Sequence, residues 1–287
     1  MRDLKGMSMN VFRERCQQNH FEKQCIGLYV AGYLRKNALN LPVVVDGGST
    51  NLCVLQGIYQ DAREGRPTVS QVLTNHLEGI YLARDLEGVR LVLRSTGGVL
   101  RVSRATFIGG ADRAIQEHEF WMAVVGANGF EPPSLQTATD SEHSVKRAMV
   151  SRARQGVIFP IDSSKWGFPA GEHLYTLDEV VSWRKRVVMV TCYPVRKEEE
   201  GESDNRFAYR VNRFLTTIAT LVDQWNYSIR VFAAPVNEEE FEFADVELPS
   251  ATSVAHELRG AYARTISPGQ ERQIGFVIRF DLWGELC

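Results

Sequence analysis

The sequence predicts an α/β protein with a mostly parallel sheet flanked by helices. Short apolar runs rich in β-branched residues alternate with helical segments, a pattern typical of βαβ units. These runs lack the period-two alternation of a half-exposed strand, as expected where helices cover both faces of a sheet. Apolar residues make up 44% and charged residues 24% of the 287 residues, so the chain is expected to be folded over most of its length.

The segments before residue 165 follow this alternation in order. Residues 12–36 predict a helix, because Phe21, Cys25 and Leu28 fall on one face. The segments that follow are a strand at 43–45, a helix to about 62, a strand at 69–73, a short helix at 76–85, strands at 89–93 and 121–125, a helix from about 139 to 154, and a strand at 157–161.

The helix predicted at 139–154 carries a sequence signal at its start. Thr139 and Glu142 form a T-x-x-E pattern, which predicts a capping box. We therefore interpret Glu142 as a cap rather than a catalyst. Val145 and Met149 lie on the predicted inner stripe, whereas the basic residues of this helix are interpreted as a solvated face. These basic residues are Lys146, Arg147, Arg152 and Arg154.

The chain changes character near residue 185. The predicted elements beyond it are a strand at 186–195, a polar loop at 196–206, a helix at 207–225, a strand at 227–236, an acidic stretch at 236–247, a helix near 252–264 and a strand near 273–283. We divide the chain into residues 1–185 and 186–287. The second part is either a small α/β domain or an extension of the first sheet.

Five predicted strands end in small or polar residues, at 46–50, 74–75, 97–98, 126–129 and 162–165. In an open parallel sheet, ligands bind outside the carboxyl ends of the strands. These five loops are therefore expected to meet at one edge and to form a binding site.

The loop at 46–50 predicts an anion site. Gly47 and Gly48 let the backbone approach a ligand. Ser49 and Thr50 then begin a helix, whose free N–H groups and positive dipole end favour an anion. Lys165 adds a compact positive charge from another strand end. Neither GxxxxGK[ST] nor GxGxxG occurs, so this is not a P-loop or a dinucleotide fingerprint.

Asp46 and Asp162 both follow buried strands. Either side chain would position a sugar hydroxyl, act as a general base, or accept hydrogen bonds from loop N–H groups. If the protein is an enzyme, the candidate catalytic residues are Asp46, Asp162 and Lys165. Among the histidines, which show no metal-ligand spacing, His76 alone follows a strand end and is a candidate ligand contact.

Composition narrows the classes of function. The 33 basic and 35 acidic residues give a net charge of −2, which argues against direct nucleic-acid binding. The apolar runs are too short to span a bilayer, and no signal peptide opens the chain, so we expect a cytoplasmic protein. With five cysteines and no CxxC, neither a disulfide framework nor a zinc site is expected. No metal or cofactor is predicted.

From about residue 20 to residue 185, the order and spacing of these motifs resemble those of the effector-sensing domain of DeoR-type bacterial transcription regulators. The residues that carry this resemblance are Glu22, Lys23, those at 46–50, Thr74, Asn75, Gly97, Gly98, Arg101, Gly109, those at 126–129, those at 139–142, those at 145–149 and those at 162–167.

The resemblance implies the α/β fold of ribose-5-phosphate isomerase and CoA transferases, a phosphorylated sugar or related metabolite as ligand, and a homo-oligomer. It assigns the effector pocket to the Asp-Gly-Gly-Ser-Thr loop, the Thr-Asn pair, the Gly-Gly turn and the Ser-Ser-Lys loop. These ligand-binding roles fall on Asp46, Gly47, Gly48, Ser49, Thr50, Thr74, Asn75, Gly97, Gly98 and Lys165.

The sequence also departs from that family. Only about twenty residues precede Glu22, too few for the family's winged helix-turn-helix, so this chain is not expected to bind DNA by itself. Residues 186–287 resemble no family that we recognise. The first hypothesis is therefore a phosphometabolite sensor that signals through a protein partner, with residues 186–287 as the output surface. The alternatives are a sugar-phosphate isomerase-like enzyme and a regulator subunit that relies on a DNA-binding partner.

Overall fold

The structure of the protein is a computed structural model, and it describes most of the chain. The described residues are 7–86, 88–137, 139–169, 171–183, 185–195, 202–225, 229–237, 243, 245–248, 254–265 and 274–282. Half of the acidic stretch predicted at 236–247, namely residues 238–242 and 244, and residues 196–201 of the loop predicted at 196–206 lie outside these residues.

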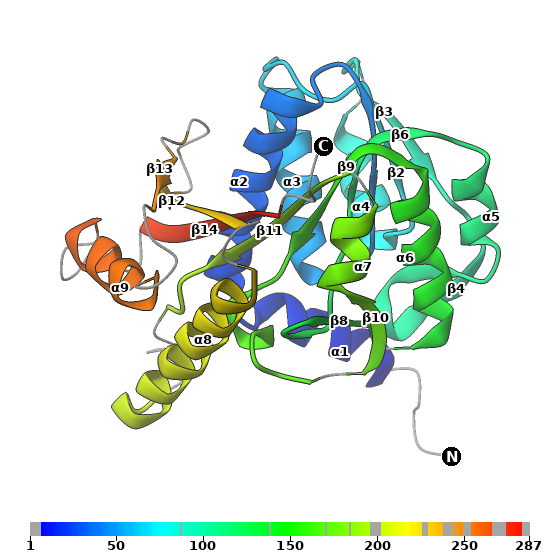
Figure 1. Ribbon diagram of the computed structural model, residues 1–287. Helices are drawn as coiled ribbons and strands as arrows, with labels where there is room; N and C mark the ends of the chain where they lie inside the picture. Colours follow the sequence, from blue (N-terminus) through cyan, green and yellow to red (C-terminus); the bar gives the residue numbers. More distant parts are fainter. Residues whose placement is uncertain are drawn as a thin grey trace.

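A nine-stranded sheet forms the middle layer of the molecule (Figure 1). Its parallel strands, in spatial order, are β11 (Arg186–Cys192), β9 (Ala153–Pro160), β6 (Phe120–Val124), β1 (Pro42–Val45), β2 (Gln71–Thr74) and β3 (Val92–Ser95). The predicted strands coincide with these elements, with ends shifted by a few residues. The predicted α/β class with a mostly parallel sheet is confirmed.

Three strands from beyond residue 186 continue the same sheet past β11. They are β14 (Ile274–Leu282), β12 (Ile229–Asn237) and β13 (Val246–Glu247), and each is antiparallel to its neighbours. The region beyond residue 185 therefore extends the first sheet rather than forming a separate one. Its division from residues 1–185 as a unit of function stays a prediction.

Helices cover both faces of the sheet, and neighbouring residues of one strand enter different cores. Val43 and Val45 pack in the core beneath α2 (His20–Asn37) and α3 (Ser49–Arg63), whereas Val44 packs in the opposite core. The helices of that opposite core are α5 (Ala111–Gln116), α6 (Asp140–Arg152), α7 (Leu177–Ser182), α8 (Asp204–Trp225) and α9 (Val254–Thr265). Burial on both faces explains why the strands read as continuous apolar runs.

Shorter elements surround the carboxyl edge of the sheet. Two small sheets form there, one of β10 (Glu172–Thr176), β8 (Ser134–Thr137) and β7 (Gly129–Glu131), the other of β4 (Val99–Arg101) and β5 (Thr106–Ile108). The short helices at this edge are α4 (Leu77–Leu82), η2 (Val102–Arg104) and η3 (Ser163–Lys165). A further one, η1 (Ala83–Asp85), follows α4 beside the C-terminal end of α3, where Arg63 donates to the Leu82 carbonyl. Apart from the helix predicted at 76–85, these elements were not predicted, because each is only a few residues long.

The prediction of one helix over residues 12–36 is wrong. The segment forms two helices, α1 (Met7–Gln17) and α2, which meet at Asn19 in the left-handed conformation with φ 52°. Asn19 tolerates this conformation better than most residues, and its side-chain amide donates to Asp162 Oδ1 at 3.2 Å. The break places α1 across the carboxyl edge of the sheet, against η2 and α3.

Candidate functional site

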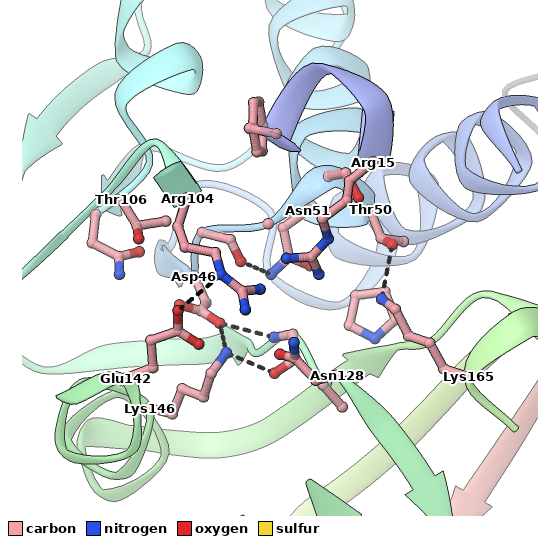
Figure 2. A pocket seen from close by; sticks show the side chains of 18 residues that line it. Arg15, Asp46, Thr50, Asn51, Arg104, Thr106, Asn128, Glu142, Lys146 and Lys165 are labelled. Atoms are coloured by element: carbon pink, nitrogen blue, oxygen red, sulfur yellow. Dashed lines mark hydrogen bonds and ion pairs between the residues drawn. The ribbon is translucent and has the colours of Figure 1, made fainter. Parts of the chain in front are cut away.

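A polar pocket opens at the carboxyl ends of β1, β2, β6 and β9 (Figure 2). Its empty volume, including the opening to solvent, is about 520 Å³. The residues that line it are Phe12, Arg15, Asp46, Gly47, Gly48, Ser49, Thr50, Asn51, Asn75, Arg104, Thr106, Gly126, Ala127, Asn128, Glu142, Lys146, Pro160 and Lys165. Four of the five loops expected to meet, those after β1, β2, β6 and β9, contribute to this lining.

The loop between β1 and α3 forms one wall of the pocket. A side chain at Gly47 would come within 1.9 Å of a Thr106 methyl carbon, so the backbone passes too close to β5 for any larger residue. Gly48 has φ +123°, a conformation that side chains disfavour. Helix α3 begins directly afterwards at Ser49. The amides of its first turn have no intrahelical acceptor, and the positive end of its dipole faces the pocket.

Asp46 is held in a buried ion pair with Lys146 of α6. The two side chains are 4% and 5% exposed. Lys146 Nζ also donates to the carbonyl oxygen of Gly126 at 2.7 Å, and Asp46 Oδ2 accepts from the Gly126 N–H at 3.1 Å. The interpretation of Lys146 as part of a solvated face is therefore wrong. Its neighbours Val145 and Met149 enter the core, and Lys146 lies at the edge of that stripe, where α6 faces the strand ends.

Asp162 and Lys165 form a second ion pair, at 3.0 Å, beside the first turn of α3. Asp162 Oδ2 accepts from the Thr50 hydroxyl at 3.4 Å, and Lys165 Nζ lies 3.5 Å from the same hydroxyl. Burial opposes the charged form of Asp162, but the ammonium groups of Lys165 and Lys23 outweigh it and hold the pKa of Asp162 well below its usual range. Burial lowers the pKa of Lys165, against the effect of Asp162.

The capping box predicted from Thr139 and Glu142 does not form. The Thr139 hydroxyl accepts from Arg101 at 2.9 Å and makes no cap bond to α6. The Glu142 carboxylate lines the pocket and lies 3.6 Å from Arg101 and 3.9 Å from Arg104. A capping box forms instead at Thr176, the start of α7.

Three buried oxygens in the lining have no hydrogen-bond partner among the residues that the structure describes. They are Asn51 Oδ1, Asn75 Oδ1 and Thr106 Oγ1. The orientation of each amide is fixed, because Asn51 Nδ2 donates to the Gly47 carbonyl at 3.3 Å and Asn75 Nδ2 donates to the Phe107 carbonyl at 3.2 Å. An unpaired buried acceptor costs free energy, so each of these oxygens favours a ligand or a water that donates to it.

The remaining residues of the predicted set lie outside the lining. Thr74 is fully buried, and its hydroxyl accepts from the His76 N–H at 3.1 Å. Gly97 and Gly98 form the turn before β4, with φ +61° and +103°. A side chain at Gly98 would meet the Ile108 carbonyl oxygen at 2.4 Å, which gives this glycine a structural role in the β4–β5 sheet.

Sequence reasoning missed several lining residues. The basic ones, Arg15, Arg104 and Lys146, lie on α1, η2 and α6 rather than in strand-end loops. Asn128 belongs to one of the predicted loops, but its role was not singled out. The position of Lys146 beside the inner stripe of α6 was a sequence signal that could have identified it. Arg15 had no such signal, because the placement of α1 depends on the break at Asn19.

His76 lies beneath the pocket as the N-cap of α4. It is fully buried, its Nδ1 accepts from the Gly79 N–H at 3.4 Å, and its ring meets the Phe12 ring edge-on at 5.3 Å. Burial lowers the pKa of His76 from 6.5 to about 4. It does not line the pocket, so its candidate role as a ligand contact stays a prediction.

We expect acid to destabilise the protein through His76. The folded protein favours the neutral ring of His76. The stability that this preference contributes is therefore fully present above pH 6.5 and is lost as the pH falls through about 4. At about 1.4 kcal/mol per pKa unit, the loss amounts to about 3 kcal/mol. His76→Asn keeps an acceptor at the cap, and its free energy of unfolding should lack this loss. Urea unfolding of both proteins between pH 4 and 7 measures the difference, and parallel curves would contradict it.

Within the described residues, no group of three or more His, Cys, Asp or Glu side chains is placed to hold a metal ion. No helix in that part of the chain is long and apolar enough to cross a membrane.

The fold and the site define an α/β protein with a charged polar pocket at the carboxyl edge of a parallel sheet. The sequence profile of the DeoR C-terminal sensor domain matches residues 18–183, more than half of the chain, and the chain belongs to this family. Membership implies that the domain binds a small-molecule effector. No curated protein matches the sequence significantly.

Several solved structures align weakly with the chain. Ribose-5-phosphate isomerase A of Neisseria gonorrhoeae is 10% identical, with 50% of this chain and 53% of that one covered and a TM-score of 0.34. The chain thus spans about half the length of that isomerase. The Methanocaldococcus jannaschii enzyme is 15% identical (91% and 81% covered, TM-score 0.35), and a plantazolicin methyltransferase is 8% identical (95% and 90% covered, TM-score 0.35). At these TM-scores the alignments carry no argument about function.

Proposed function

We propose that this protein is a cytoplasmic sensor of a phosphorylated metabolite, a sugar phosphate or a related nucleotide metabolite. One observation carries the proposal: the same pocket holds cationic groups and buried acceptors that lack donors. A ligand with a phosphate group and several hydroxyls supplies both an anion for the cations and donors for the acceptors.

The cationic side of the pocket favours a phosphate. The free amides at the start of α3 lie next to the ammonium group of Lys165, which is within 3.5 Å of the Thr50 hydroxyl. Backbone N–H groups at a helix N-terminus combined with a lysine form a common phosphate site. Gly48, which directly precedes α3, adds no side chain here, and nothing lies within 4 Å of the position where one would begin.

The part of the pocket that holds the unpaired oxygens favours a polyol, a ligand with several hydroxyl groups. Asn51, Asn75 and Thr106 are at most 6% exposed, and their unpaired oxygens belong to residues that line the pocket. Hydroxyl groups of a sugar donate hydrogen bonds and would satisfy them. An apolar ligand would leave these oxygens unpaired at a cost of about 1–3 kcal/mol each.

The isomerase alternative requires a general base in the same pocket. Asp46 and Asp162 are both held in ion pairs with lysines, at Lys146 and Lys165. The pKa of Asp162 is held well below its usual range, whereas an efficient general base has a pKa near the working pH. These ion pairs favour sensing over catalysis. Turnover of any pentose or hexose phosphate by the purified protein would favour the enzyme instead.

The proposal is tested by thermal melting against a panel of phosphosugars, nucleotides and the matching unphosphorylated sugars. A ligand at about 100 times its dissociation constant should stabilise the protein by about 2.7 kcal/mol, a shift of several degrees for a chain of this length. Lys165→Ala should lose the shift for phosphorylated compounds. Arg154→Ala is the control, because the Arg154 side chain is 66% exposed and lies at the amino-terminal end of β9, whereas the pocket opens at the carboxyl end of that strand. No shift with any compound would contradict the proposal.

We further propose that the bound state is transmitted through residues 186–287 to a protein partner. Contacts between η3 and the C-terminal region support this route. Arg213 of α8 donates to the Ser164 carbonyl at 3.2 Å. The buried Glu22 carboxylate accepts from the Ser163 hydroxyl at 2.6 Å and from the Val195 N–H at 3.0 Å, and burial raises its pKa to about 7.

A pull-down with the tagged protein tests this route. The compound that stabilises the protein should change which partner proteins it retains. An identical set of retained proteins with and without the compound would contradict signalling through a partner.

A further inference from the structure

Helix α1 belongs to the pocket although it lies outside the residues that match the sensor family, 18–183. Its Phe12 is 6% exposed and packs on the His76 ring, and both Phe12 and Arg15 line the pocket. The helix is attached through the break at Asn19, which the side-chain amide ties to Asp162. Figure 2 shows Arg15 reaching from this helix toward Arg104 and Asn51. One wall of the pocket is therefore a separate element outside the family domain.

The charges of the pocket pair with one another except at Arg15. Lys146 pairs with Asp46, Lys165 with Asp162, and Arg104 with Glu142. Among the described residues, no hydrogen bond or ion pair reaches the Arg15 guanidinium. Burial lowers the pKa of Arg15, and repulsion from Arg104 lowers it further. The Arg104 guanidinium lies close enough to repel Arg15, and the two carboxylates that attract Arg15 are shared with other cations: Glu142 lies near Arg101 and Arg104, and Asp162 pairs with Lys165.

We propose that Arg15 and Arg104 join Lys165 in holding the anionic group of the ligand and clamp it between their guanidinium groups, so that Arg15 decides the preference for phosphorylated over unphosphorylated compounds and the ligand holds α1 closed over the pocket. This inference rests on the proposed function. An anion between the two guanidinium groups supplies the missing counter-charge, and guanidinium groups match phosphate oxygens in geometry. Because Arg15 is attached through α1, the clamp closes only when this helix lies on the pocket.

The test compares Arg15→Gln with Arg13→Gln, a matched control on the same helix whose side chain is exposed. Calorimetry gives the dissociation constants for inorganic phosphate and for each phosphosugar that stabilises the wild type, with the unphosphorylated sugars alongside. Loss of one charge-assisted contact should weaken phosphorylated ligands about ten- to a hundredfold in Arg15→Gln. Arg13→Gln should bind as the wild type does, and the unphosphorylated sugars should bind equally to all three proteins.

Two further measurements separate recognition from folding. Arg15→Lys keeps the charge but not the two-point geometry of a guanidinium group, so it should retain part of the preference for phosphorylated compounds and bind them more tightly than Arg15→Gln does. Amide exchange in α1 should slow when the ligand binds to the wild type and to Arg13→Gln, but not to Arg15→Gln. Equal affinity of Arg15→Gln and Arg13→Gln for a phosphorylated ligand would overturn the clamp and leave the proposed function standing. Failure of the wild type to bind any phosphorylated compound, inorganic phosphate included, would overturn both.

Discussion

Lys146→Met is expected to destabilise the protein by about 3–5 kcal/mol, because it leaves the buried Asp46 carboxylate without its cation. Among the described residues, Asp46 would retain only the Gly126 N–H, at 3.1 Å, as a hydrogen-bond donor. The carbonyl oxygen of Gly126 would also lose the bond from Lys146 at 2.7 Å. Urea unfolding at pH 7, followed by circular dichroism, measures the change.

The next residue supplies the control for this prediction. Arg147 is exposed, and its guanidinium lies 5.2 Å from the Tyr175 ring. Arg147→Met should therefore cost less than about 1 kcal/mol. Adding Asp46→Asn to Lys146→Met removes the unpaired charge and should restore at least half of the lost stability. If Lys146→Met were as mild as Arg147→Met, the ion pair would not be the stabilising feature described above.

Trp166→Ala is expected to destabilise the protein by about 3–5 kcal/mol. The ring is fully buried directly after η3, and its Nε1 donates to the Ile161 carbonyl at 3.2 Å. It packs against Phe130 of β7 at 4.9 Å, Phe214 of α8 at 5.7 Å and Phe280 of β14 at 5.4 Å between ring centroids. The substitution removes contacts on both sides of the boundary near residue 185.

Phe168, two residues further along, is 50% exposed and serves as the control. Phe168→Ala should change the free energy of unfolding by less than about 1 kcal/mol. Since Trp166 contacts both parts of the chain, Trp166→Ala should lower one shared unfolding transition, observed equally by circular dichroism and by calorimetry. Two separate transitions, with only one of them shifted, would show that the parts unfold independently.

The sequence was most informative where helices cover a strand on both faces. Val43, Val44 and Val45 read as a strand because all three are buried, and the same reasoning placed β6, β9 and β11. It was least informative where a short sequence pattern is overridden by a hydrogen bond to a residue far away in the chain. The Thr139 hydroxyl accepts from Arg101, 38 residues away, instead of capping α6.

The residues of the site likewise divide into those that the sequence identified and those that it did not. The loop from Asp46 to Thr50 was found because its glycines and hydroxyls lie next to each other in the chain, and the structure places all five residues in the pocket lining. Lys146 and Arg15 were not found, since a basic residue on an amphipathic helix is usually solvated. Only the packing of α6 and the break before α2 direct these two side chains inward. The ligand-binding roles of all these residues stay predictions.

The position of β14 within the sheet constrains how the protein is made on the ribosome. Strand β14 lies between β11 and β12, although it is the last of the described strands in the chain. While the chain is being synthesised, β11 therefore presents an open row of backbone amides and carbonyls until residues 274–282 have emerged. Such an edge pairs readily with other strands. A nascent chain that stops before residue 274 exposes an aggregation-prone edge, so the sensor domain is protected only once residues 274–282 have been translated.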